Sequence, residues 1–141
     1  MSIIGLDIGD KTIGISVSDP GKSIALGLKT LKRENIKEDL TKIKKVVDDY
    51  KTEKIVLGYP KNMDGSIGKS AQKVLDFEKE LKSFIDLETV FWDERLTTLE
   101  AEKLLIHGNV KRKKRREVID TLSAVLILQN YLDYYKNRGK M

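Results

Sequence analysis

Carboxylates interrupt three segments of the sequence that are otherwise apolar. Asp7 lies within the run 3–8, the pair Asp93-Glu94 ends the run 89–92, and Asp120 lies within an apolar pattern at 118–125. An ionised carboxylate that is buried without a partner is strongly destabilising. A shared divalent cation removes this penalty, and two ions roughly 4 Å apart activate a water and stabilise the leaving oxygen of a phosphodiester. The sequence therefore predicts a nuclease in which Asp7, Glu94 and Asp120 bind Mg²⁺ or Mn²⁺.

Each carboxylate also has a purely structural explanation. Asp7 could hydrogen-bond a turn, Asp93 and Glu94 could cap a helix or pair with Arg95, and Asp120 could pair with nearby arginines. The three positions together favour the cation, because a mixed sheet can bring strand ends and a helix to one edge.

Strand alternation bears on the choice between Asp93 and Glu94. Adjacent residues of a strand face opposite sides of the sheet. Glu94 shares its parity with Val90 and Trp92. Alternation alone leaves the choice open; we favour Glu94 as the catalytic and metal-binding residue and keep Asp93 as the second candidate.

A run of six basic residues, 111–116, precedes Asp120. The net charge of +5 comes from 27 basic and 22 acidic residues, so without the run it would be −1. Such a run is often only a solvated loop. Clustered Lys and Arg also release counterions from a phosphate backbone, and six engaged residues would give a log-log salt slope of about −5. Because the run lies beside the predicted cleavage site, we expect it to bind nucleic acid through backbone and shape.

Composition excludes other kinds of site. The absence of cysteine excludes disulfides and thiolate zinc sites, and fits a reducing cytoplasm. His107 is the single histidine, which excludes a zinc site built on several imidazoles, and a serine hydrolase triad unless His107 is its base; it is assigned no role. The length of 141 residues and the 40% apolar content predict one globular domain, 1–141. With no recognisable signal peptide or membrane span, we expect a cytoplasmic protein.

The elements that must position these residues are three strands, followed by a helix, a strand, a helix, a strand and two helices. Short alternating runs predict strands at 3–8, 12–18 and 23–29, joined as an antiparallel meander, and further strands at 54–57 and 88–92. Apolar residues at helical spacing predict helices over 35–50 and 69–85. A capping box predicts a third helix over 97–108, and the last helix spans 117–135. The expected fold class is α/β, with a five-stranded mixed sheet, three antiparallel strands and then two further strands, flanked by helices.

These motifs resemble those of the YqgF family, also named RuvX, of RNase H-like proteins. The matching segments are Gly5-Leu6-Asp7-Ile8-Gly9 with Lys11 and Ile13-Gly14, Gly58-Tyr59-Pro60 with Asn62-Met63-Asp64-Gly65, Asp93-Glu94-Arg95-Leu96-Thr97-Thr98, and Ile119-Asp120 with Ser123-Ala124. The resemblance covers essentially the whole chain. Tyr59 stands where family members commonly have a smaller aliphatic residue.

The resemblance implies an RNase H-like fold and a bacterial cytoplasmic nuclease that acts in 5′-end maturation of 16S ribosomal RNA. It implies that Asp7, the Asp93-Glu94 pair and Asp120 are the acidic site residues, with Arg95 and Thr97 beside them. A divalent cation, Mg²⁺ or Mn²⁺, is the expected cofactor. The residues expected to contact nucleic acid are Lys11, Arg95, Lys111, Arg112, Lys113, Lys114, Arg115 and Arg116.

Three rival functions remain open on the sequence. A Holliday junction resolvase acting on four-way DNA would need two active sites related by a dyad, whereas we expect a monomer or weak dimer. A phosphotransferase of the actin and sugar-kinase type begins with a similar glycine-rich hairpin but normally needs two such domains. A non-catalytic RNA-binding factor for ribosome assembly would keep the basic run and show no metal-dependent turnover. The sequence leaves open the choice of RNA or DNA, the cleavage position and polarity, and the native metal.

Overall fold

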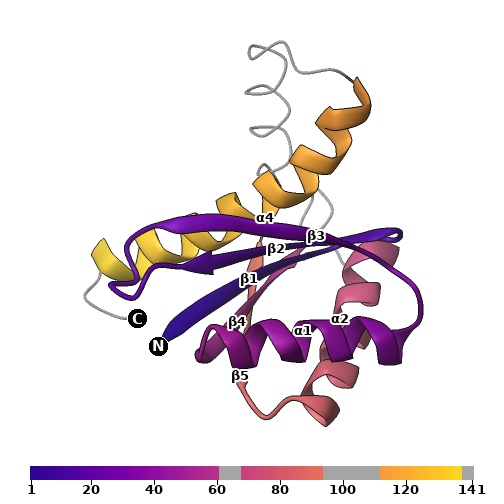
Figure 1. Ribbon diagram of the computed structural model, residues 1–141, viewed down its shortest axis with the longest axis horizontal. Helices are drawn as coiled ribbons and strands as arrows, with labels where there is room; N and C mark the ends of the chain where they lie inside the picture. Colours follow the sequence, from indigo (N-terminus) through magenta and orange to yellow (C-terminus); the bar gives the residue numbers. More distant parts are fainter. Residues whose placement is uncertain (61–67, 94–111, 138–141) are drawn as a thin grey trace.

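A five-stranded sheet lies between two helical layers (Figure 1). This computed structural model describes residues 1–60, 68–93 and 112–137, with the side chains of the last helix described over 121–135. The elements are β1 (Ser2–Ile8), β2 (Thr12–Ser18), β3 (Ala25–Lys32), α1 (Ile36–Asp49), β4 (Thr52–Tyr59), α2 (Lys69–Phe84), β5 (Glu88–Asp93) and α4 (Arg112–Asn137).

The strand order is β3-β2-β1-β4-β5, which confirms the expected mixed sheet. β1 pairs antiparallel with β2, and β2 antiparallel with β3, as the short connections predicted. β4 pairs parallel with both β1 and β5. The carboxyl ends of β1, β4 and β5 therefore lie at the same edge, where α/β sheets bind ligands.

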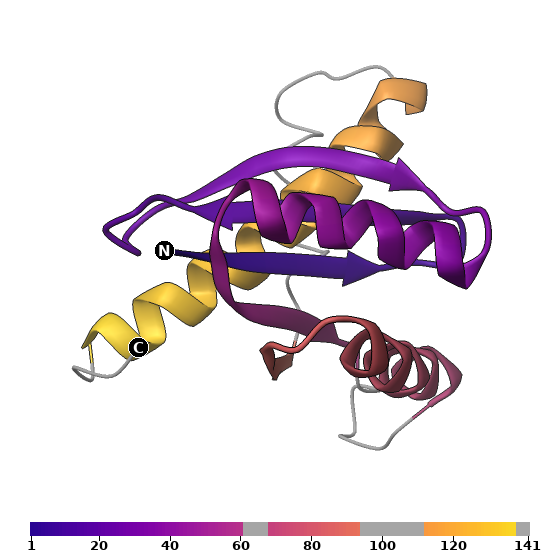
Figure 2. The ribbon, with the colours of Figure 1, turned by 60° about the horizontal axis from the view of Figure 1, so that its bottom comes forward.

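Alternating residues of β1 belong to two separate cores. Ile4 and Leu6 pack in the core under α1 and α2, whereas Ile3 packs with Ile127 and Leu128 of α4. Figure 2 shows α1 in front of the sheet and α4 behind it. Odd-numbered positions of β1 thus face α4, and even-numbered positions face α1 and α2.

The third strand begins later than the sequence predicted. The Asp19 carboxylate accepts hydrogen bonds from the backbone N–H groups of Ser23 (2.8 Å) and Ile24 (2.9 Å), so the turn extends through Ile24. The same bonds hold the pKa of Asp19 below its usual value. At its other end the strand continues to Lys32, which pairs with Thr12. The predicted bounds 23–29 were therefore wrong at both ends.

A β-bulge divides β3 into two halves. Ile15 pairs with Lys29 and Ser16 with Gly27, so Leu28 is an extra residue on the β3 side. The bulge shifts the alternation of the strand by one position. Gly27 faces α4 before the bulge, and Thr30 faces α4 after it.

The described helices end close to the predicted bounds, with one exception. Asn35 caps α1, because its side-chain oxygen accepts the backbone N–H of Glu38 at 2.9 Å. The last helix begins at Arg112 rather than at 117, so five of the six residues of the basic run are helical. The helix expected over 97–108 lies outside the described residues. Within the described ranges, none of the helices has the length and hydropathy to cross a membrane.

Candidate active site

Asp7 lies near the carboxyl end of β1 on the face covered by α4. It pairs with Gly14 of β2, which pairs in turn with Thr30 of β3. Cross-strand partners project from the same face of a sheet. Thr30 reaches α4 directly, because its Oγ1 lies 2.5 Å from Oγ1 of Thr121. The half-buried Asp7 carboxyl group therefore belongs to the row of residues beside the amino-terminal half of α4.

Glycines flank Asp7 on both neighbouring strands. Gly14 is its partner on β2. On β4 the register pairs Leu6 with Leu57, which places Gly58 next to Asp7. Neither neighbour has a side chain, so this row of the sheet leaves room for a ligand beside the carboxylate.

β5 ends at the same edge of the sheet as β1. Tyr59 pairs with Asp93, and the rings of Tyr59 and Phe91 are 5.3 Å apart in the core under α1 and α2. Trp92 lies on the other face, where its ring is 5.9 Å from that of Tyr131. By strand alternation Asp93 follows Phe91, on the face opposite Asp7. Glu94 lies outside the described residues.

Glycine allows α4 to lie very close to the sheet. A Cβ atom on Gly5 would be 2.5 Å from Oγ of Ser16 and 2.9 Å from Cβ of Leu128, and one on Gly27 would be 2.7 Å from Cγ2 of Thr121. The buried Ser16 hydroxyl donates a hydrogen bond to the Ala124 carbonyl at 2.7 Å. The contacts at Ala124 and Leu128 fix the position of α4 on the sheet, one and two helical turns after Asp120.

Asp120 is helical, as predicted, but its side chain lies outside the described part. Asp120 precedes Ala124 by four residues, about one helical turn. The side chain of Ala124 is fully buried against the sheet. Asp120 thus falls on the helical stripe that continues through Ala124 and Leu128.

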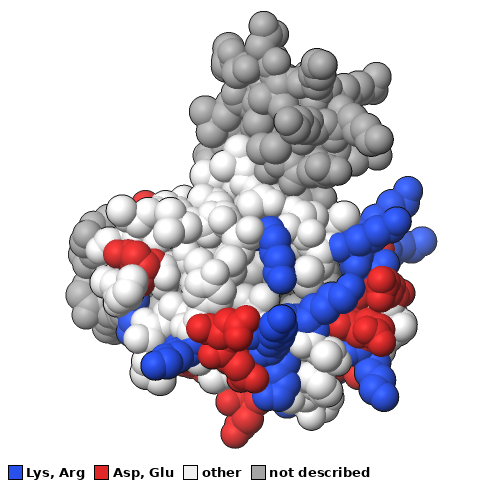
Figure 3. Space-filling view, viewed as in Figure 1, with Lys and Arg blue, Asp and Glu red and all other residues white. Residues whose placement is uncertain are grey.

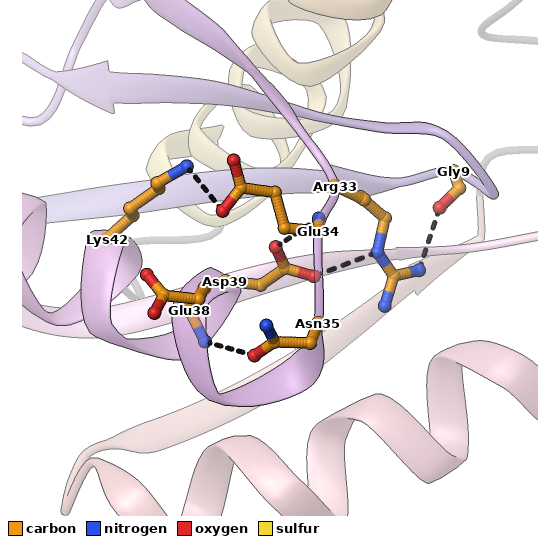
Figure 4. A network of polar contacts seen from close by, with 7 residues as sticks. All are labelled: Gly9, Arg33, Glu34, Asn35, Glu38, Asp39 and Lys42. Carbon is orange, nitrogen blue, oxygen red and sulfur yellow. Dashed lines mark hydrogen bonds and ion pairs between the residues drawn. The ribbon is translucent and has the colours of Figure 1, made fainter.

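A polar network holds the turn between β1 and β2 (Figure 4). Arg33 donates from Nη1 to the Gly9 carbonyl at 2.9 Å and from Nε to Oδ2 of Asp39 at 3.2 Å. Asp39 is only 2% exposed and also accepts the backbone N–H of Glu34. The network ties the turn, and with it Lys11, to the start of α1.

Arg33 and Asp39 were missed by the sequence reasoning. The available signal was Asp39 itself, a carboxylate next to Leu40 on the apolar stripe of α1. A buried acid on such a stripe requires a cationic or hydrogen-bonding partner.

A second contact ties the same turn to α2. Lys73 donates to Oδ1 of Asp10 at 2.6 Å. This hydrogen bond, reinforced by the charge of Lys73, lowers the pKa of the exposed Asp10 carboxyl group.

Asp7, Gly14 and Thr30 form one cross-strand row, called here the Asp7 row. A groove of about 900 Å³ opens beside this row, on the face of the sheet that α4 covers. Its lining residues come from the β1–β2 turn, β2, β3 and α4. Among the described residues, the lining consists of Lys11, Thr12, Thr30, Lys32, Thr121, Leu122 and Val125. Of the residues predicted to contact nucleic acid, Lys11 is thus placed in a groove near Asp7.

The remaining predicted site residues are only partly described. Arg112, Lys113, Lys114, Arg115 and Arg116 are in the first turns of α4, while Arg95 and Lys111 lie outside the described residues. Within the described part of the chain, His, Asp and Glu residues form no group of three that could hold a metal ion. In the lower part of the view in Figure 3, which contains α1, basic and acidic side chains are intermixed. The surface above them is largely uncharged.

Comparison with known proteins places the chain in a family. The RuvX family, described as Holliday junction resolvase, matches residues 1–134. A relative from Thermoanaerobacter pseudethanolicus named "Putative pre-16S rRNA nuclease" is 50% identical over 139 residues, covering 98% of this chain and 100% of the relative. A relative of the same name from Clostridium tetani is 46% identical over 138 residues, covering 98% and 100%.

Solved structures share the fold at low sequence identity. RuvC of T. thermophilus in complex with a Holliday junction substrate superposes with a TM-score of 0.60 at 16% identity, covering 99% of this chain and 97% of that one. The Fowlpox virus resolvase bound to Holliday junction DNA gives a TM-score of 0.59 at 12% identity, covering 95% and 98%. These structures confirm the RNase H-like fold, and the family match and the close relatives show that the chain belongs to the RuvX family.

Proposed function

We propose that this protein is a metal-dependent nuclease that hydrolyses phosphodiester bonds in the 5′-end maturation of pre-16S ribosomal RNA. The observation that carries the proposal is the position of Asp7, a half-buried carboxylate between two glycines at the ligand-binding edge of the sheet. Relatives that are half identical over almost the whole chain are named for this activity. Residues 1–141 would form a single nuclease domain in the cytoplasm.

The chemistry of the donor set fits a hard divalent cation. Asp7 is on the α4 face, and Asp120 occupies the stripe of α4 that packs against that face. Asp93 follows Phe91 in strand alternation, on the face opposite Asp7, and we therefore favour Glu94 over Asp93 as the ligand. Carboxylate oxygens are the ligands that Mg²⁺ and Mn²⁺ prefer. Asp7, Glu94 and Asp120 would therefore hold the ions.

Bound ions of this kind activate a water nucleophile and stabilise the charge that develops on the leaving oxygen. The protein residues have separate tasks. The Asp7 row orients the scissile phosphate at the end of β1, and Lys11 on the adjacent turn neutralises a flanking phosphate. Arg33 and Asp39 keep that turn in place through the Gly9 carbonyl. The basic start of α4 would hold more distant parts of the nucleic acid.

The test is cleavage of precursor 16S rRNA with Mg²⁺, Mn²⁺ or a chelator. Asp7→Asn and Glu94→Gln should each lower the cleavage rate by at least about 100-fold while RNA binding persists, because each removes a charged ligand. Asp93→Asn is the matched control and should retain most of the activity. Full activity of Asp7→Asn would refute the assignment.

A four-way DNA junction belongs in the same experiment, because the family description names junction resolution. Metal-dependent cleavage of the precursor with an intact junction supports the rRNA function. Cleavage of the junction alone would replace it with junction resolution. RNA binding without cleavage of either substrate would replace it with a non-catalytic assembly role.

A further inference from the structure

The groove beside Asp7 combines cationic, hydroxyl and apolar groups. Lys11 and Lys32 supply ammonium groups, and Leu122 and Val125 of α4 supply apolar surface. The threonines at 12, 30 and 121 supply a hydroxyl and a methyl group each. Its volume of about 900 Å³ is within the range of pockets that enclose small organic molecules. Positive charge can neutralise a phosphate, and adjacent apolar surface can pack against a sugar or base. This combination is typical of a nucleotide-binding site.

The β3 bulge creates this combination. Because Leu28 is the extra residue, Thr30 and Lys32 turn toward α4, whereas Lys29 pairs with Ile15 on the opposite face. Thr30 then meets Thr121 at 2.5 Å, which fixes the helix against the second half of the strand. Lys32 pairs with Thr12, and both residues line the groove.

The groove continues the row of Asp7. Asp7, Gly14 and Thr30 are successive cross-strand partners on one face, so Thr30 lies about 10 Å from Asp7 at the usual strand spacing. Gly14, between them, places no side chain in the way. A nucleic-acid strand whose phosphate lies at Asp7 can therefore continue over Gly14 into the groove.

We propose that this groove binds an unpaired nucleotide of the substrate strand, next to the phosphodiester held at Asp7. Lys11 and Lys32 contact its phosphates, and Leu122 and Val125 pack against its sugar and base. The inference rests on the proposed nuclease function and adds a preference for single-stranded RNA around the cleaved bond. A duplex keeps its bases stacked inside and presents phosphates and hydroxyls, which would leave the apolar wall unused.

Lys32→Gln tests the phosphate contact, and Lys29→Gln is its matched control. Both variants remove one exposed lysine from β3, but only Lys32 lines the groove. Binding of a fluorescent single-stranded RNA is measured by anisotropy over a range of KCl concentrations, with chelator present to prevent cleavage. Lys32→Gln should weaken binding about fivefold at 0.1 M salt and reduce the log-log salt slope by about 0.7, as expected for one lost phosphate contact. Lys29→Gln should bind like the wild type.

Leu122→Ala tests the apolar wall. Leu122 is only partly buried, so its truncation should leave the fold intact, which circular dichroism checks. Single-stranded RNA should bind about two- to fivefold more weakly at every salt concentration, because the lost contact is not ionic. Binding of the same sequence as a duplex should be unchanged.

The outcomes separate this inference from the nuclease assignment. If the wild type cleaves RNA but Lys32→Gln binds single strands as Lys29→Gln does, the groove proposal is wrong. The same conclusion follows if Leu122→Ala weakens duplex and single strand equally. If the wild type cleaves nothing while both groove variants lose single-strand binding selectively, the groove proposal stands and the nuclease assignment fails.

Discussion

Gly5→Ala should destabilise the protein by forcing α4 away from the sheet. The added Cβ would be 2.5 Å from Oγ of Ser16, 2.9 Å from Cβ of Leu128 and 3.1 Å from the Ala124 carbonyl oxygen. The serine and leucine are fully buried, and the third atom is helix backbone. None of them is the free end of a flexible side chain, so the helix itself has to move.

Three effects determine the size of the change. Overpacking of a close-packed core costs about 1–3 kcal/mol. Displacing α4 also weakens the 2.7 Å hydrogen bond from Ser16 to the Ala124 carbonyl, which adds about 0.5–1.5 kcal/mol. Replacing glycine by alanine restricts the unfolded chain, which offsets about 0.4–1 kcal/mol. The clash dominates, and the expected net loss is about 1–3 kcal/mol.

Urea unfolding followed by far-UV circular dichroism measures this loss. With a urea dependence of about 2 kcal/mol per molar, the midpoint should fall by about 0.5–1.5 M. Gly21→Ala is the control, because its nearest contact is the Asp19 carboxylate at 3.3 Å in an exposed turn, and it should change stability by less than about 0.5 kcal/mol. Under conditions where Gly5→Ala is folded, its cleavage rate should still be reduced, since α4 carries Asp120. An unchanged midpoint would refute the close-approach argument.

Two further substitutions probe the turns at the two ends of β2. Arg33→Lys should lower stability by about 1–3 kcal/mol and reduce the cleavage rate, because one ammonium group cannot reach both the Gly9 carbonyl and Asp39; unchanged urea midpoint and rate would contradict this. Asp19→Asn should show a pH-dependent loss. The folded-state pKa of Asp19 is lowered by hydrogen bonds from Ile24 and Ser23, so its contribution is present above the unfolded-state pKa and lost as pH falls through the folded value. The stability difference from wild type should therefore be clear at pH 7 and shrink at pH 3 in urea titrations; an equal difference at both would contradict it.

Local sequence signals predicted the described elements, because such signals do not depend on tertiary contacts. The helical spacing of Ile36, Leu40, Ile43 and Val47 marked α1, and the alternation of Ile13 and Ile15 marked β2. The start of α4 was different. The basic run was expected to precede the helix, but lysine and arginine are good helix formers, and the helix begins at Arg112.

The β3 bulge could not be predicted, because it depends on tertiary contacts. Thr30 faces α4 through its contact with Thr121, 91 residues away in the sequence. Nothing in the local pattern indicates that Leu28 is an extra residue. The groove, and the position of Lys32 in its lining, were missed for the same reason.

The acidic site stays a prediction, and the structure describes only part of it. Asp7 was recognised because a carboxylate in a buried strand is costly, and the structure places it at the ligand-binding edge. Glu94 lies outside the described residues and stays a prediction, whereas alternation on β5 puts Asp93 on the face opposite Asp7. The Arg33–Asp39 pair that supports the site gave a weaker signal, because the partner of a buried acid cannot be read from sequence spacing.

The extra residue in β3 has a consequence for tolerance of length changes. Deleting Leu28 would restore a regular ladder and leave the remaining residues of both halves on their present faces of the sheet. Lys29 would then follow Gly27 directly and still pair with Ile15 on the face opposite α4, and Thr30 would still meet Thr121. A single-codon deletion of Leu28 should therefore be less harmful than a two-codon deletion of Leu28 and Lys29, which would move Thr30 to the face opposite α4.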